Sequence, residues 1–364
     1  MKRYSWHFLL LILVCSGLSA CGKPEAQAML EDYAARVSRV LEVDINLDLS
    51  EAALAIPALP QRRERLLPTT EIREGVLDVW DFEQCGMMNL IAERNSSLGK
   101  VMAPSQKMRY EIRFIQALQN CQAQMQAIAE PDKKQREFIQ RLDDIYAIKQ
   151  ANFPAELWNG LYTSEEISQQ FALGKAPLPL QDTGFGHIQR ALEQLHSLAQ
   201  LSEQNTITPP QWLSDIEDVY FTFYRTDYGA QFLTGLVMLT QTLDRTATAI
   251  EQRMQQSPFC PKGHQPRRAT ILFNVFRKYY AGEVQPYMAL IQREGQQWLT
   301  LHHAIMDTLP PPPAMQRYRA QVLALDTADS LWQQWQAASQ RHTDAWQAIL
   351  GQCDLMPKAP QDVR

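Results

Sequence analysis

The chain has 364 residues, of which 45% are hydrophobic, so it is long enough to bury a core as one large domain or two ordinary ones. Charged residues make up 21% and the formal net charge is −5, which excludes a basic nucleic-acid-binding protein and a disordered acidic tail. The six cysteines are too few for a small disulfide-knot scaffold.

The N-terminus has the pattern of a secretory signal. A basic start is followed by an apolar run over residues 8–14, which is too short to cross a membrane, and then by small residues. Residues 18–21 (Leu-Ser-Ala-Cys) resemble the bacterial lipobox, in which the cysteine thiolate takes a diacylglycerol group. We expect residues 1–20 to be a lipoprotein signal peptide and Cys21 to be lipidated. The alternative is an ordinary secretory signal that is cleaved near Ala20.

Acyl chains on this cysteine would attach the chain to a membrane without spanning it. Gly22 stands where enterobacterial lipoproteins that stay in the inner membrane have Asp, so the resemblance implies the outer membrane, with the body facing the periplasm. Lys23 leaves inner-membrane retention open, because sorting rules differ among bacteria. Residues 21–27 are expected to be a short lipid-anchored tether, and no later segment approaches 18 uncharged apolar residues.

Helical periodicity dominates the rest of the chain. Apolar side chains recur at steps of three or four residues in 26–42, 76–97, 105–129, 232–254, 267–308 and 326–351. No segment longer than a few residues alternates with period two. We therefore predict an all-α fold, an elongated bundle of long antiparallel helices with Pro- and Gly-rich connections. Pro286 is expected to kink or break its helix near residue 285.

Proline and glycine divide this helical pattern. Residues 44–70 are punctuated by proline and are predicted to be an extended loop with short helical turns. Residues 172–186 are expected to separate an N-terminal helical region, 28–173, from a C-terminal helical bundle, 184–364. Four consecutive prolines at 310–313 stop one long helix before the next.

Four cysteines follow the expected lipidation site. An even number in an oxidising compartment predicts two disulfides, with three connectivities. Segments 76–97 and 105–129 are predicted to form an antiparallel helical hairpin, in which Cys85 and Cys121 each lie about 20 Å from the turn on an apolar stripe. The two sulfur atoms should then meet, so Cys85–Cys121 is the first predicted bridge.

The second pair follows the same argument. Cys260 lies in a breaker-rich loop before the helix predicted over 267–308, and Cys353 follows the helix predicted over 326–351. If these helices pack antiparallel, the chain end returns to the loop and Cys260–Cys353 forms. The alternative use of the cysteines is metal binding, since Cys85 precedes two methionines and Cys260 lies four residues before a histidine, but the paired spacing of a zinc site is missing. We predict no metal and no cofactor.

The most distinctive polar string is Ala-Glu-Arg-Asn-Ser-Ser-Leu-Gly-Lys over residues 92–100. A structural interpretation makes Gly99 a left-handed helix cap and places Arg94 at the negative end of the helix dipole. A functional interpretation has Arg94 and Lys100 binding an anionic ligand. The candidate ligand contacts are then Glu93, Arg94, Asn95, Ser96 and Lys100.

This string also carries a resemblance to a known family. A cysteine on a helix, the string AERNSSLGKVMAPS, Tyr110-Glu111, Phe114 and a second cysteine are similar to uncharacterised proteobacterial lipoproteins of about this length. The resemblance covers mainly residues 76–121 and the lipobox. It implies an envelope location, and it supplies no activity, cofactor or catalytic residue.

The histidines form no recognisable site motif. His342 lies on a Trp-rich apolar stripe, where a buried histidine bonded to a neighbour is expected. His302 and His303 are adjacent on a helix and point about 100° apart, so they cannot bind one ion together. His187 follows Gly186, but its surroundings depart from the Gly-x-His-x-x-Glu pattern of imelysin-like iron-uptake lipoproteins.

Two function classes remain. We expect an envelope lipoprotein whose helical body interacts with another envelope protein or a cell-wall component, with no nucleic acid. The alternative is a periplasmic enzyme or small-ligand carrier with a polar site near Arg94. An aromatic group over residues 220–228 is either core or a stacking groove. An exposed apolar patch would favour a partner, and a pocket lined by Glu93, Arg94 and a group with a shifted pKa would favour chemistry.

Overall fold

The computed structural model describes residues 23–72, 80–261 and 264–356, so the expected signal peptide and Cys21 lie outside the described residues. Every regular element within these ranges is helical, as predicted. The N-terminal half contains α2 Glu25–Leu41, α3 Leu49–Leu54, α4 Arg62–Arg65, η1 Trp80–Cys85, α6 Met88–Asn95, η2 Gly99–Val101, α7 Pro104–Gln126, α8 Lys133–Tyr162 and α9 Glu165–Gln169. The remainder contains α10 Phe185–Ala199, η3 Gln200–Glu203, η4 Gln211–Asp215, α11 Ile216–Tyr224, α12 Tyr228–Gln256, α13 Arg267–Val275, η5 Phe276–Val284, α14 Gln285–Thr308, α15 Pro313–Tyr318, η6 Arg319–Leu323 and α16 Leu331–Gln352.

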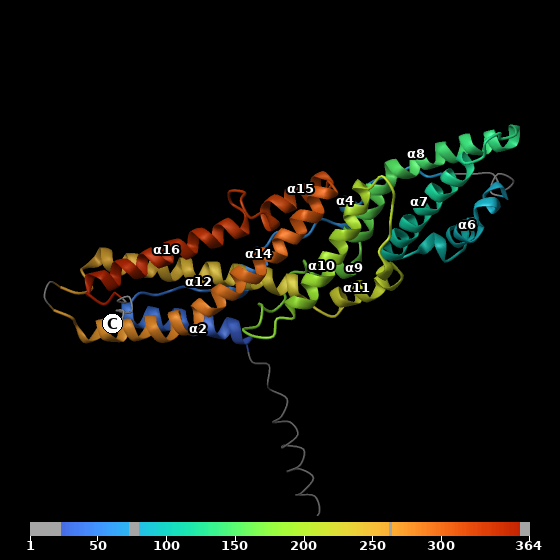
Figure 1. Ribbon diagram of the computed structural model, residues 1–364. Helices are drawn as coiled ribbons and strands as arrows, with labels where there is room; N and C mark the ends of the chain where they lie inside the picture. The colour runs from blue at the N-terminus through green and yellow to red at the C-terminus, as the bar shows by residue number, and fades with distance from the viewer. Residues whose placement is uncertain (1–22, 73–79, 262–263, 357–364) are drawn as a thin grey trace, which may run out of the picture.

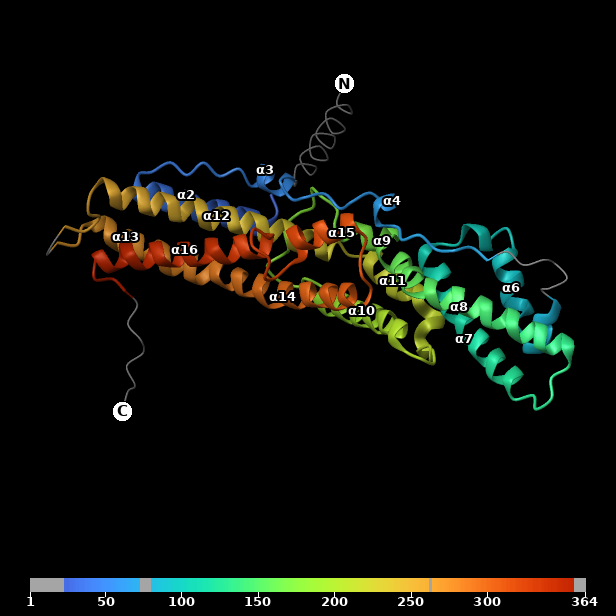
Figure 2. The ribbon, with the colours of Figure 1, turned by 90° about the horizontal axis from the view of Figure 1, so that it is seen from above.

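The molecule is elongated, with a long bundle at one end and a smaller helical head at the other (Figures 1 and 2). The bundle consists of α2, α12, α13 to α14, and α16. The head consists of η1, α6, η2, α7 and most of α8, as far as Glu156. Because no helix in the described ranges combines enough length with enough hydrophobicity, none of them qualifies as a membrane span.

The bundle is built on the apolar stripes that the periodicity predicts. Leu30, Tyr33, Val37 and Leu41 of α2 are at most 1% exposed, and they pack in the core shared with α12 and α16. Gly295 lets α14 approach α12, since a Cβ at this position would lie 2.1 Å from a ring carbon of Phe232.

Helix directions in the bundle are mixed. Arg341 of α16 pairs with Asp244 and Glu251 of α12, and further along both helices Gln352 at the end of α16 accepts from the Phe259 N–H just after α12, so α12 and α16 run parallel. Glu42 at the end of α2 meets Arg268 at the start of α13, so the long helix of α13, η5 and α14 runs against α2. Phe276 packs against Trp346 and Tyr280 against His342, so the antiparallel arrangement predicted for 267–308 against 326–351 is present.

Pro286 lies in the first turn of α14, which begins at Gln285. The chain does not break there. It remains helical and takes a π-helical winding over η5, immediately before the proline. The interruption predicted near residue 285 is thus a change of helix type rather than a gap.

The prediction of one continuous helix over 76–97 is wrong. Gly86 has φ +67°, and its backbone N–H donates to the carbonyl of Glu83, while the N–H of Met87 donates to the carbonyl of Phe82. These two bonds form a Schellman end to η1, and α6 starts anew at Met88. The left-handed glycine of this region is therefore Gly86.

Both predicted disulfides are present. Cys85–Cys121 has a Cα–Cα distance of 5.3 Å, and Cys260–Cys353 has one of 5.2 Å. The first joins η1 to α7 in the head, and the second ties the end of α16 to the loop before α13. The extended loop with helical turns over 44–70 is also confirmed, since it contains α3 and α4. The division of the chain at residues 172–186 stays a prediction.

Candidate functional site

The head contains a pocket of about 600 Å³ between α6, α7, α8 and residues 69–72. This volume lies in the range of small-molecule sites. The lining residues are Thr69, Thr70, Glu71, Ile72, Phe82, Ile91, Arg94, Asn95, Lys100, Lys107, Tyr110, Glu111, Phe114, Ile145, Lys149 and Glu156.

One face of each helix supplies the walls. On α7 the lining residues are Lys107, Tyr110, Glu111 and Phe114, which follow the i, i+3, i+4, i+7 spacing of a helical stripe. Helix α8 runs antiparallel to α7, as two ion pairs show. Lys107 Nζ lies 2.8 Å from a Glu156 oxygen, and Lys149 Nζ lies 2.7 Å from a Glu111 oxygen.

These ion pairs neutralise two nearly buried carboxylates. Glu111 is 5% exposed and Glu156 is 6% exposed, so each needs its lysine to remain charged inside the head. Lys149 also lies 5.0 Å from the ring centroid of Phe114, in a cation–π contact. The pocket wall is therefore charged, but two of its cations, Lys107 and Lys149, are already paired with carboxylates.

Two asparagines of α8 hold residues 67–70 of the chain. Asn152 accepts from the backbone N–H of Thr70 at 3.0 Å and donates to its carbonyl at 2.8 Å. Asn159, two turns later, makes the same pair of bonds with Leu67, both at 2.8 Å. Each side-chain amide thus replaces the partner that a neighbouring strand would provide, and this places Thr69 to Ile72 along the pocket. No local sequence pattern indicates this role for either asparagine.

Three of the five candidate ligand contacts reach the pocket, namely Arg94, Asn95 and Lys100. The other two are not lining residues. Glu93 pairs with Arg113 at 3.2 Å, and the Ser96 hydroxyl donates to the Glu93 carbonyl at 2.8 Å and accepts from the Gly99 N–H at 2.9 Å.

Arg94 donates from Nη1 to the Gly99 carbonyl at 2.5 Å. This bond folds η2 back against the end of α6. A Cβ at position 99 would lie 2.1 Å from the Glu93 carbonyl oxygen, so only glycine permits the approach. The expectation that Gly99 is a left-handed cap is wrong, because its φ is not positive and α6 has already ended at Asn95.

Tyr110 is 3% exposed, and its ring stacks on Phe114 with a centroid distance of 5.5 Å. Burial, with a further contribution from the Glu111 charge, raises the pKa of the Tyr110 phenol well above its usual range. The phenol therefore stays protonated and is available as a hydrogen-bond donor in the pocket wall.

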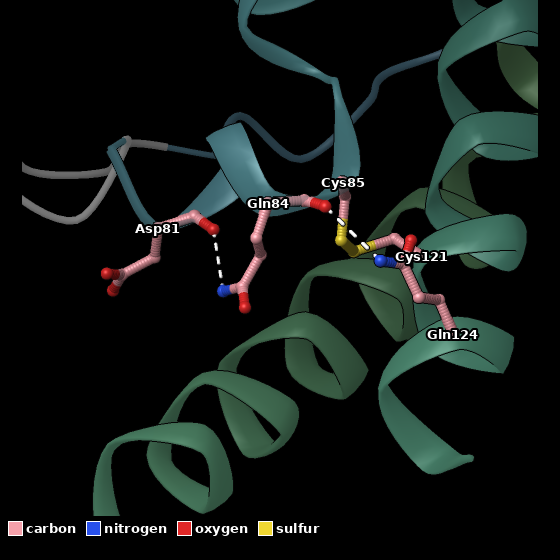
Figure 3. The surroundings of a disulfide bond; sticks show 5 residues. All are labelled: Asp81, Gln84, Cys85, Cys121 and Gln124. Carbon is pink, nitrogen blue, oxygen red and sulfur yellow. Dashed lines mark hydrogen bonds between the residues drawn. A yellow bond between two sulfur atoms is a disulfide. The ribbon is translucent and has the colours of Figure 1, made fainter. Parts of the chain in front are cut away.

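The disulfide fixes the end of the pocket that is far from the bundle. Figure 3 shows Cys85 bonded to Cys121, with Gln124 of α7 donating to the Gln84 carbonyl at 3.3 Å beside it. The bridge holds η1 on α7, so that Phe82 lines the pocket and meets Phe138 of α8 edge-on at 5.2 Å.

A family model matches residues 30–357, which is most of the chain and includes the whole head. The chain belongs to the family described as a protein of unknown function (DUF3080). No curated protein and no solved structure matches it. The description assigns no activity to DUF3080, so the geometry of the pocket is the basis for a proposal.

The buried histidines of this DUF3080 chain are structural. His342 Nε2 lies 2.7 Å from the Tyr33 hydroxyl, to which Trp346 donates at 2.9 Å, and His302 Nδ1 lies 2.9 Å from the Tyr162 hydroxyl. Burial lowers the pKa of both His302 and His342 to about 3. Within the described ranges no three His, Cys, Asp or Glu side chains converge as metal ligands.

The aromatic group over 220–228 is divided between core and surface. Tyr220, Phe223 and Tyr228 are buried. Phe221 and Tyr224 of α11 are 53% and 61% exposed, and their rings stack at 6.2 Å. None of the five lines the head pocket.

Proposed function

We propose that this chain is an envelope lipoprotein, attached through acyl chains on Cys21 to the outer membrane and facing the periplasm, whose head pocket holds a small ligand. The observation that carries the proposal is the pocket itself. Residues 69–72 and the elements η1, α6, η2, α7 and α8 all contribute to it, and its lining includes four cations and three carboxylates around apolar walls. The geometry therefore favours a ligand carrier over a scaffold.

The location is supported by the sequence and by the cysteines. Residues 18–21 match the lipobox pattern, and the four later cysteines are all paired, as expected in an oxidising compartment. Helix α2 begins at Glu25, close to the proposed anchor, and its first residues lie near the middle of the molecule (Figure 1). A lipid on Cys21 would thus leave the head free at the far end.

Native mass spectrometry of the protein purified from its own membranes tests both parts. We expect a chain that starts at an acylated Cys21 and retains a noncovalent small molecule. Asn95→Trp should lose that molecule, because residue 95 is exposed and lines the pocket, so the larger ring enters it. Ser97→Trp is the matched control, since Ser97 is equally exposed and lies outside the lining.

Two results would contradict the proposal. An unacylated Cys21, or a retained leader, would remove the envelope address. A small molecule that Asn95→Trp retains as firmly as Ser97→Trp, or the absence of any such molecule, would remove the carrier role.

A protein partner is the second candidate function. Leu98 and Val101 of the η2 region are 81% and 76% exposed, beside the rim residue Lys100. Exposed apolar side chains that form a contiguous patch are typical of contact surfaces. A photo-crosslinker at residue 98 should capture one specific envelope protein that a crosslinker at the exposed Leu54 does not; equal capture at both positions would exclude this role.

A further inference from the structure

We propose that the ligand of the head pocket is an amphiphilic anion, an acid whose carboxylate or sulfonate group is attached to a compact apolar body. This inference rests on the proposed function, and it assigns a chemical class to the ligand. Three features of the pocket support it: uncommitted cations at one end, a protonated phenol beside them, and aromatic and branched side chains at the other end.

The cationic end is formed by Arg94 and Lys100. Lys107 and Lys149 are neutralised by Glu156 and Glu111, whereas neither Arg94 nor Lys100 has a carboxylate partner within the described ranges. The bond from Arg94 to the Gly99 carbonyl uses one of the five N–H donors of the guanidinium and holds the group at the rim. The remaining donors suit the fork-like recognition of a carboxylate or sulfonate.

Tyr110 adds a neutral donor to this end. Its hydroxyl makes no hydrogen bond to any other described residue, and its phenol is buried among the lining groups. Because the phenol keeps its proton, it can donate to an oxyanion and does not repel it. A cationic ligand is disfavoured, since Glu111 and Glu156 are nearly buried and each is engaged by a lysine, and Glu71, the third lining carboxylate, is not free either.

The apolar end lies toward the disulfide. Along α7 the polar Lys107 comes first and Phe114 comes last, and along the antiparallel α8 Ile145 lies opposite the Phe114 end. Phe82 from η1 and Ile91 from α6 complete this wall. The one cation near this wall, Lys149 over Phe114, is paired with Glu111, so it is the unpaired charge that is separated from the hydrophobic surface along the pocket, as in an amphiphilic ligand.

Two fluorescent probes of similar apolar size test the charge requirement directly. 1-Anilinonaphthalene-8-sulfonate is an anion, and N-phenyl-1-naphthylamine is its uncharged counterpart. The protein is the whole mature chain with Cys21→Ser, which avoids the detergent and lipid that would bind both dyes. We expect one equivalent of the sulfonate dye to bind at least tenfold more tightly than the neutral dye.

The variants assign the binding to the two ends. Arg94→Gln with Lys100→Gln should weaken the sulfonate dye at least tenfold and leave the neutral dye within twofold. Lys133→Gln with Lys134→Gln removes the same charge from exposed positions of α8 and should change neither affinity. Phe114→Ala should weaken both dyes.

The outcomes separate the two proposals. If Asn95→Trp abolishes binding of both dyes but the charge variant affects neither, the pocket binds ligands without selecting an anion and this inference fails alone. If Asn95→Trp and Phe114→Ala leave both dyes unaffected, or if neither dye binds, the pocket is not a site for apolar ligands. The inference and the carrier function then fail together.

Discussion

Individual side chains divide the charges of the head into two groups. The lysines at 107 and 149 serve the fold, because each neutralises a carboxylate that is almost inaccessible to water. Arg94 and Lys100 serve no ion pair among the described residues and remain available at the rim. The burial of their carboxylate partners, rather than residue type, thus separates the two paired lysines from the cations proposed to bind a ligand, and this difference can be measured.

Lys149→Met should destabilise the protein by about 3 kcal/mol, since it leaves the Glu111 carboxylate buried without a partner. Lys100→Met should change the free energy of unfolding by less than about 0.5 kcal/mol, because Lys100 is exposed. Urea unfolding of the two variants checks this. Equal losses of stability in the two variants would show that the Lys149–Glu111 ion pair does not stabilise the fold.

His302 and His342 should make stability depend on pH between 6.5 and 5. Their pKa is about 3 in the folded state and near 6.5 in the unfolded chain, so the unfolded state binds more protons in this window. Stability is therefore lost as the pH falls, by about 1.4 kcal/mol per pH unit for each histidine. Unfolding of the wild type and of His342→Gln at pH 7 and pH 5 tests this prediction. The free energy of unfolding should fall less between the two pH values in the variant, because one histidine fewer takes up a proton on unfolding. An equal fall in both proteins would contradict the assignment to His342.

At the scale of the helical elements, hydrophobic periodicity predicted the features that depend on local sequence alone. The helix expected over 105–129 is α7, Pro104–Gln126, and the pairing of Cys85 with Cys121 was predicted correctly although Cys85 lies in η1 and not on a continuous helix over 76–97. The break at Gly86 was missed because a glycine inside a helical pattern is compatible with either continuation or a left-handed end. The role of Asn152 could not be predicted from local sequence, because its partner Thr70 lies 82 positions away.

Each disulfide should affect a different part of the molecule. Replacing both cysteines of Cys85–Cys121 by serine should cost about 4 kcal/mol by loop closure and also weaken the neutral dye, because η1 carries the pocket residue Phe82. The same replacement at Cys260–Cys353 should cost a similar amount and leave the dye affinity unchanged. Chemical unfolding and dye titration of the two double variants distinguish these effects. Equal losses of dye affinity would mean that the first bridge has no special role in the pocket.

Across the whole molecule, the all-α architecture follows from the sequence, whereas the pocket does not. Its lining comes from segments as far apart as Thr69 and Glu156, and only the Arg94–Lys100 end was visible as a local motif. The bundle lies at the end of the molecule opposite the head (Figure 2). An anchor at Cys21 would therefore act at a distance from the pocket, and removing the lipid should leave ligand binding intact.

A crystal structure of the mature Cys21→Ser chain with 1-anilinonaphthalene-8-sulfonate would test the central claim most directly. We predict the sulfonate within hydrogen-bond distance of the Arg94 guanidinium, and the aromatic body against Phe114 and Ile145. A dye bound only on the exposed surface of Leu98 and Val101, with an empty head pocket, would contradict the account and favour the partner-binding role instead.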